Sequence, residues 1–103
     1  MPTYFHVAPT AARGQIAAEG LLVQGADYYE EQTPGVYAWE SDRAARRCQR
    51  EYERLGEAPF DVWSFGSAAL ADDPLCPGGV FSTEPIPSGR VRLYLRASWK
   101  DED

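Results

Sequence analysis

The pattern of apolar and polar residues predicts five strands and two helices. Short apolar runs, or runs in which apolar and polar residues alternate, predict strands, and apolar residues three or four positions apart predict helices. The expected strands cover about residues 3–8, 35–39, 61–65, 79–83 and 90–96. The expected helices cover about residues 11–19 and 42–55. In the last strand, Val91, Leu93 and Leu95 are expected to face inward, since successive side chains point to opposite faces.

Polar residues and glycines mark the ends of the two expected helices. Thr10 is expected to cap the first helix through its side-chain oxygen, and Gly20 to end it. Ser41 is expected to cap the second helix, which ends at Gly56. Apolar residues at helical spacing predict a stripe along the second helix that packs against the rest of the protein. The residues of this stripe are Ala44, Ala45, Cys48, Tyr52 and Leu55.

The order of these elements predicts an α+β fold. Both helices come early, and three strands joined by short Gly/Pro turns follow them, unlike the regular alternation of a doubly wound parallel sheet. A chain of 103 residues is long enough for one hydrophobic core. We therefore expect a single domain over residues 1–98 and an acidic tail over residues 99–103. Residues 24–34 mix Gly, Pro, acidic residues and tyrosines, and are expected to form a long exposed loop.

Composition and charge restrict the possible functions. No stretch of about 18 apolar residues exists, so no membrane partner is expected. The N-terminus lacks the basic and apolar segments of a secretory signal, which favours a cytoplasmic protein. The net charge of −6 argues against duplex nucleic acid as a partner. Cys48 and Cys76 lack the spacing of a zinc site, and both are expected to be free thiols.

Five of the nine arginines fall within the second expected helix. They are Arg43, Arg46, Arg47, Arg50 and Arg54. One interpretation is a solvated helix face with ion pairs such as Arg47 with Glu51 and Arg50 with Glu53. The other is an arginine ridge that contacts phosphate, because planar guanidinium groups suit phosphate oxygens. The sequence leaves both interpretations open.

Three short motifs, taken in order along the chain, resemble the ADP-ribosyltransferase fold. They are Tyr4-Phe5-His6-Val7-Ala8-Pro9, Ile16-Ala17-Ala18-Glu19-Gly20-Leu21-Leu22 and Pro34-Gly35-Val36-Tyr37-Ala38-Trp39. They are most similar to the diphtheria-toxin and poly(ADP-ribose) polymerase branch, in which a histidine on the first strand precedes a Gly-Leu pair and a Gly-x-Tyr strand. Residues 79–87 also resemble the last strands of RNA 2′-phosphotransferases. The likeness covers residues 4–95 and implies a small split β-sheet with two early helices.

The resemblance implies that the protein breaks the nicotinamide–ribose bond of NAD and transfers ADP-ribose to a macromolecular acceptor, such as a protein. In that branch the histidine bonds a ribose hydroxyl, the tyrosine ring stacks on nicotinamide and a glutamate stabilises the cationic sugar. Carried over, the three catalytic residues are His6, Tyr37 and Glu84. The implied cofactor-binding residues are His6, Tyr37, Tyr52 and Arg13. A fixed carboxylate suits this chemistry, because it interacts more strongly with the developing positive charge than with neutral substrate.

Two features depart from the family pattern. The position of the family's second aromatic residue, on the helix after the tyrosine strand, holds Cys48, and Tyr52 follows one turn later. A single histidine cannot supply the additional histidine that the phosphotransferases use, so that activity is not expected. The alternative function is a catalytically inactive module of the same fold that binds a protein partner or an ADP-ribose-like nucleotide. Apart from the resemblance, His6 and Tyr37 are explained as packed strand residues and Glu84 as an acid in a turn.

Overall fold

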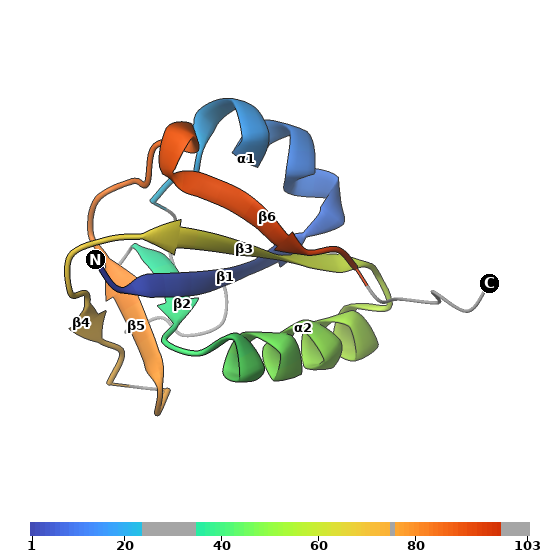
Figure 1. Cartoon of the computed structure of the whole chain (residues 1–103). Helices are drawn as coiled ribbons and strands as arrows, with labels where there is room; N and C mark the ends of the chain where they lie inside the picture. Colours follow the sequence, from blue (N-terminus) through green and yellow to red (C-terminus); the bar gives the residue numbers. More distant parts are fainter. Residues whose placement is uncertain (24–34, 75, 98–103) are drawn as a thin grey trace.

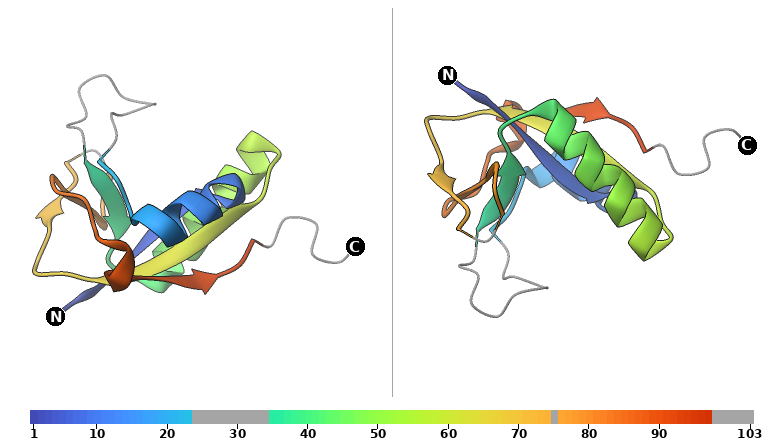
Figure 2. Two further views of the ribbon diagram at one scale, coloured as in Figure 1. Left: turned by 90° about the horizontal axis from the view of Figure 1, so that it is seen from above. Right: turned by 90° about the horizontal axis from the view of Figure 1, so that it is seen from below.

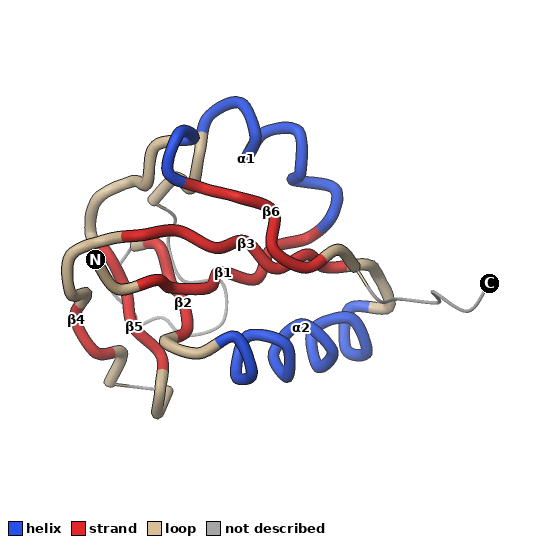
Figure 3. Tube along the Cα trace, viewed as in Figure 1, coloured by secondary structure: helices blue, strands red, loops and turns tan. Residues whose placement is uncertain are grey.

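The computed structural model describes residues 1–23, 35–74 and 76–97, in which a six-stranded sheet separates two helices (Figures 1 and 3). The strands are β1 (Thr3–Pro9), β2 (Val36–Trp39), β3 (Phe60–Gly66), β4 (Ala71–Asp72), β5 (Gly79–Ser82) and β6 (Val91–Leu95). The helices are α1 (Arg13–Glu19) and α2 (Asp42–Gly56), with short 3₁₀ turns η1 (Thr10–Ala12) and η2 (Ser88–Arg90). The strand order is β4-β5-β2-β1-β3-β6, and every neighbouring pair is antiparallel. This arrangement confirms the α+β class with two early helices.

The sheet has two parts that meet at β1 and β2. β1 pairs with β3 along its whole length, through seven register pairs from Thr3↔Gly66 to Pro9↔Phe60. β1 and β2, by contrast, share the single register pair Phe5↔Trp39. Figure 2 shows that β2 and β5 turn away from the direction of β1 and β3. We call the region around Phe5, His6, Tyr37 and Trp39 the β1–β2 junction.

The main core lies on the face of the sheet that α1 and the segment after it cover. Its buried apolar residues are Tyr4, Ala8, Ile16, Leu21, Val36, Ala38, Trp63, Phe65, Val80 and Ile86. Gly20 ends α1 as expected, with a φ of +82° that favours glycine. A Cβ atom at Gly20 would lie 2.1 Å from the Ile86 oxygen. This close approach lets Leu21 and Ile86 exchange two backbone hydrogen bonds of 2.9 Å, which fix the chain beside α1.

The two expected N-caps have different outcomes. Ser41 caps α2 as expected, because its Oγ accepts a hydrogen bond from the Ala44 N–H at 3.1 Å. The expectation for Thr10 is wrong, since it begins η1 and no side chain caps either η1 or α1. The Thr10 hydroxyl instead donates to Asp61 Oδ1 on β3, at 3.1 Å. A long-range acceptor has replaced the local one that the sequence suggested.

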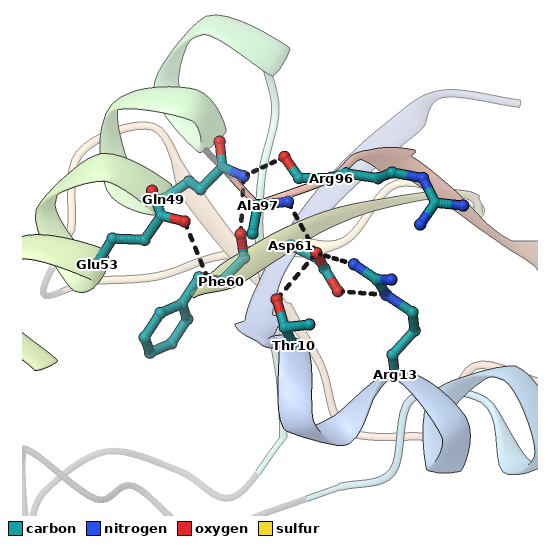
Figure 4. Close-up of polar contacts among 8 residues, drawn as sticks. All are labelled: Thr10, Arg13, Gln49, Glu53, Phe60, Asp61, Arg96 and Ala97. Carbon is teal, nitrogen blue, oxygen red and sulfur yellow. Dashed lines mark hydrogen bonds and ion pairs between the residues drawn. The ribbon is translucent and has the colours of Figure 1, made fainter. Parts of the chain in front are cut away.

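The buried side of α2 differs from the expected apolar stripe. Ala45 is buried as expected, but the other buried residues are Gln49 and Glu53, and Leu55 is 68% exposed. Gln49 Nε2 donates to the Phe60 oxygen at 2.8 Å, and Glu53 Oε2 accepts from the Phe60 N–H at 3.1 Å (Figure 4). These bonds satisfy the backbone at the start of β3, so polar residues occupy the face that the hydrophobic pattern assigned to Leu55.

The last part of the chain follows the expected alternation. Val91, Leu93 and Leu95 of β6 are half-buried, and the residues between them are exposed. The two-residue strand β4, which pairs with β5, lies between the strands expected at 61–65 and 79–83, where no strand was expected. The expected loop at 24–34 and the tail at 99–103 lie outside the described residues. None of the described helices is both long enough and apolar enough to cross a membrane.

Candidate functional site

His6 lies at the β1–β2 junction, where its side chain contacts the backbone of β2. Its Nδ1 atom is 2.6 Å from the Tyr37 carbonyl oxygen. A carbonyl only accepts hydrogen bonds, so Nδ1 carries the proton and donates it. The next ladder step beyond Phe5↔Trp39 would pair Val7 with Tyr37, but the backbone pairing stops before it. The imidazole therefore links the two strands where their backbones separate.

The environment of His6 keeps its imidazole neutral. Burial lowers the pKa of His6 below its ordinary value, against the smaller opposing effect of the bond to the Tyr37 carbonyl. With the proton on Nδ1, the Nε2 atom holds a lone pair and accepts hydrogen bonds. No hydrogen bond to Nε2 occurs among the described residues. His6 thus presents a fixed acceptor, which suits a hydroxyl donor such as that of a ribose.

Trp63 of β3 lies directly opposite His6 in the β1–β3 ladder, so the two side chains share a face of the sheet. Trp63 is 3% exposed. Its Nε1–H is the one buried side-chain polar atom that has no hydrogen-bond partner in the described part of the chain. Buried donors are normally paired, so this one lacks the acceptor that it would usually have. No sequence pattern indicates this unpaired donor, because a tryptophan in an apolar strand predicts packing alone.

Tyr37 contributes its backbone to the junction and its ring to β5. The ring is half-buried and stacks on Phe81, with centroids 5.4 Å apart and planes 22° apart. Val36 and Ala38 belong to the core, so the alternation along β2 turns Tyr37 to the other side of that strand. Burial, with a smaller contribution from Asp73, raises the pKa of the Tyr37 hydroxyl, which stays protonated at neutral pH.

Glu84 lies on an exposed turn two residues after β5. The Ser82 hydroxyl accepts from the Glu84 N–H at 3.1 Å and donates to the Glu84 carbonyl at 2.7 Å. These bonds fix the backbone of the turn, as expected of an acid in a turn. No hydrogen bond or ion pair of the Glu84 carboxylate is found among the described residues. Its catalytic role stays a prediction.

Arg13 is bound to a buried carboxylate that the sequence did not single out. Its Nε and Nη2 atoms donate to Asp61 at 3.0 and 2.8 Å, and Asp61 is fully buried (Figure 4). The Ala97 N–H adds a second donor group at 3.0 Å, and the Thr10 hydroxyl a third. Burial raises the pKa of Asp61, but the bonds from Arg13 and Thr10 outweigh it, so the pKa lies below its ordinary value. Asp61 therefore joins α1 to β3 and to the chain after β6.

Tyr52 lies on α2, where its ring meets Phe60 edge-on with centroids 5.5 Å apart. The thiol of Cys48 is near Trp39 and Tyr52, and burial raises its pKa, so it is a protonated thiol. Cys48 and Cys76 are both free, as expected. No group of three or more metal-ligating side chains occurs among the described residues.

The structure thus places the His6 imidazole against the backbone carbonyl of Tyr37, leaves the Tyr37 ring on the other side of β2, and sets Trp63 beside His6. It places Arg13 and Tyr52 in contact with other parts of the protein and Glu84 on an exposed turn. Comparisons with protein-family models, with curated proteins and with solved structures find no match for this chain. The β1–β2 junction is accordingly the feature of the molecule that bears on its function.

Proposed function

We propose that the protein is a small NAD-dependent ADP-ribosyltransferase whose substrate NAD binds at the β1–β2 junction. The observation that carries the proposal is the bond from His6 Nδ1 to the Tyr37 carbonyl. That bond fixes the tautomer and holds Nε2 as an acceptor, and the ribose hydroxyls of NAD are donors. This is the role that the resemblance assigns to the histidine of the first strand.

The form of the sheet supports the same proposal. The resemblance implies a split β-sheet with two early helices. A single register pair between β1 and β2, beside seven between β1 and β3, agrees with a split at this position. Trp63 adds a buried donor opposite His6, which could bond an oxygen of the same ligand. An acceptor and a donor on one face are what a polar nucleotide needs for its orientation.

In the proposed reaction the bond between nicotinamide and ribose breaks, and nicotinamide leaves with the electron pair. The ribose carbon then forms a bond with a nucleophilic atom of the acceptor, which loses its proton. Glu84 is the proposed carboxylate that stabilises the positive charge on the sugar in between. Among the described residues its side chain is not engaged elsewhere. The contacts of Arg13 and Tyr52 favour positioning roles, in which they hold α1 and α2 in place.

Nicotinamide release and thermal melting of the wild type and Glu84→Gln test the proposal. The substitution keeps the shape of the side chain and removes its charge, so we expect turnover to fall by about 10² to 10³-fold, or about 2.7–4 kcal/mol. NAD at about 100 times its dissociation constant should stabilise both proteins by about 2.7 kcal/mol. Glu57→Gln, an exposed substitution after α2, is the matched control and should behave as the wild type. A wild type that neither releases nicotinamide nor gains stability with NAD contradicts the proposal.

A catalytically inactive nucleotide-binding module is the second candidate. The exposed turn that holds Glu84 favours it, because a carboxylate in water stabilises a cation less than one fixed in a dry site. This module would gain stability with NAD or ADP-ribose and lose that gain in His6→Gln, yet release no nicotinamide. The two candidates therefore differ in turnover and agree in binding.

A further inference from the structure

Helix α2 carries five arginines along one side, and each of them has another three or four residues away on that side. We call them the arginine stripe: Arg43, Arg46, Arg47, Arg50 and Arg54. All five are exposed, and at 1.5 Å per residue the stripe extends about 16 Å along the helix. Together with Glu51 they line a shallow hollow of about 430 Å³.

The acids on α2 neutralise little of this stripe. Glu51 pairs with Arg54, not with Arg47. Glu53 is turned into the protein, 3% exposed, where it accepts from the Phe60 N–H. Among the described residues, the pair of Arg54 with Glu51 is the only ion pair of the stripe. The interpretation of α2 as a face balanced by internal ion pairs is therefore not supported.

The stripe weakens the helix that carries it. Like charges three or four residues apart repel each other and destabilise a helix. Arg43 and Arg47, Arg46 and Arg50, and Arg50 and Arg54 are such pairs. The repulsion is relieved when an anion lies along the stripe, and a chain of regularly spaced charges matches it best.

We propose that the arginine stripe binds the phosphate backbone of a single-stranded nucleic acid. Guanidinium groups form two parallel hydrogen bonds with phosphate oxygens and stack on unpaired bases, and a single strand presents both groups. The net charge of −6 opposes the dense charge of a duplex. A single strand can follow the stripe without bringing a second strand close to the acidic remainder of the surface. At physiological salt, charges more than about 8 Å apart are largely screened, so the distant acidic residues repel the single strand only weakly.

Fluorescence anisotropy with a labelled 12-nucleotide oligouridine tests this assignment on the full chain. The same measurement uses a duplex of equal length and a polyglutamate peptide as competitors. We expect the single strand to bind most tightly. If three or four phosphates are contacted, log K should fall with log salt with a slope of about −2 to −3. Arg46→Gln/Arg50→Gln should reduce the affinity about tenfold and make the slope shallower by about 1.

The matched control is Arg92→Gln/Arg96→Gln, which removes the same charge from exposed positions in and after β6. We expect it to change the affinity by less than about twofold. An equal loss in both double variants, tighter binding of duplex or polyglutamate, or no binding by the wild type overturns the proposal. The stripe variant should melt at or above the wild-type temperature, because it relieves repulsion within α2. Its response to NAD should be unchanged, so this proposal and the proposed function fail independently.

Discussion

The two parts of the sheet use their buried polar groups in different ways. In the β1–β3–β6 part, the buried Asp61 and Gln49 are bonded to groups of the protein itself. At the junction with the β2–β5–β4 part, one register pair and the bond from His6 to Tyr37 connect the strands, while His6 Nε2 and the Nε1–H of Trp63, opposite it on β3, have no hydrogen-bond partner among the described residues. The first part thus provides a fixed frame, and the junction holds the acceptor and the donor that, under the proposed function, would bind a ligand.

The frame is held at one end by the side chains of Asp61 and Gln49, which form their hydrogen bonds at neighbouring residues of β3, Asp61 itself and Phe60, as Figure 4 shows. Asp61 receives bonds from Thr10, Arg13 and Ala97. Gln49 donates to the oxygens of Phe60 and Arg96, the latter at 3.1 Å. Both centres join helices to the strands, so the position of His6 on β1 depends on bonds far from the junction. Fully satisfied buried networks of this kind make a structure rigid.

The largest expected effect comes from Asp61→Ala. The substitution removes the acceptor of three groups at once, and a broken buried ion pair costs about 3–5 kcal/mol. The Arg13 side chain is 35% exposed, so its guanidinium group can be solvated by water once Asp61 is removed. We therefore expect the lower end of that range, a loss of about 3 kcal/mol in the free energy of unfolding. Urea denaturation followed by circular dichroism measures it. Asp72→Ala, on the exposed strand β4, is the control and should cost less than about 0.5 kcal/mol. A similar loss in both variants would show that Asp61 holds no frame.

Gln49→Leu should have the next largest effect, about 2 kcal/mol in the same measurement. Leucine fills nearly the same space, but the oxygens of Phe60 and Arg96 then lose their donor. The control is Gln15→Leu, because Gln15 is an exposed residue of α1. We expect no more than about 0.5 kcal/mol there. Equal stability of Gln49→Leu and the wild type would mean that water replaces the lost bonds and that α2 is held by apolar contacts.

Sequence patterns succeeded where neighbours along the chain determine a residue's environment. The alternation of Val91, Leu93 and Leu95, the cap at Ser41 and the end of α1 at Gly20 all follow from local geometry. Each of these features depends on residues within a few positions, which a sequence displays directly.

The same patterns failed where the partner is distant. Hydrophobicity alone placed Leu55 in the core and left Gln49 outside, because it contains no information about the unpaired backbone of Phe60. Thr10 was assigned to a cap for the same reason, although its acceptor is Asp61, which is 51 residues away. Burying a polar group is favourable only when its partner is in place, and the partner is known only from the fold.

The candidate site shows the same division. Family resemblance selected His6 and Tyr37, and the structure places them in contact. The contact, however, uses the Tyr37 carbonyl, which no side-chain pattern could indicate. Trp63 and Asp61 were not selected, because their positions opposite His6 and Ala8 follow from the β1–β3 register. That register is set by long-range packing and cannot be derived from one strand alone.

The pH dependence of stability gives the smallest expected effect and tests the junction directly. The pKa of His6 is lower in the folded protein than its ordinary value of 6.5. As the pH falls through 6.5, the unfolded chain therefore binds a proton that the folded protein does not, and stability is lost towards lower pH. The slope cannot exceed about 1.4 kcal/mol per pH unit for one proton. Urea denaturation between pH 7.5 and 5.5 measures this loss.

The variant His6→Gln supplies the control. His6 is the only histidine of the chain, and a glutamine at this position can still donate a hydrogen bond to the Tyr37 carbonyl but does not titrate. The variant should keep most of the stability at pH 7.5 and lose the slope below it. NAD affinity of the wild type should stay constant near pH 6.5, because folded His6 keeps Nε2 as an acceptor there, and should fall only at the lower pH at which the folded imidazole gains its proton. Parallel stability curves for the two proteins would mean that His6 accepts its proton as readily as it does in water. The junction would then be as open to solvent as any exposed strand end, and the contrast with the frame would lose its basis.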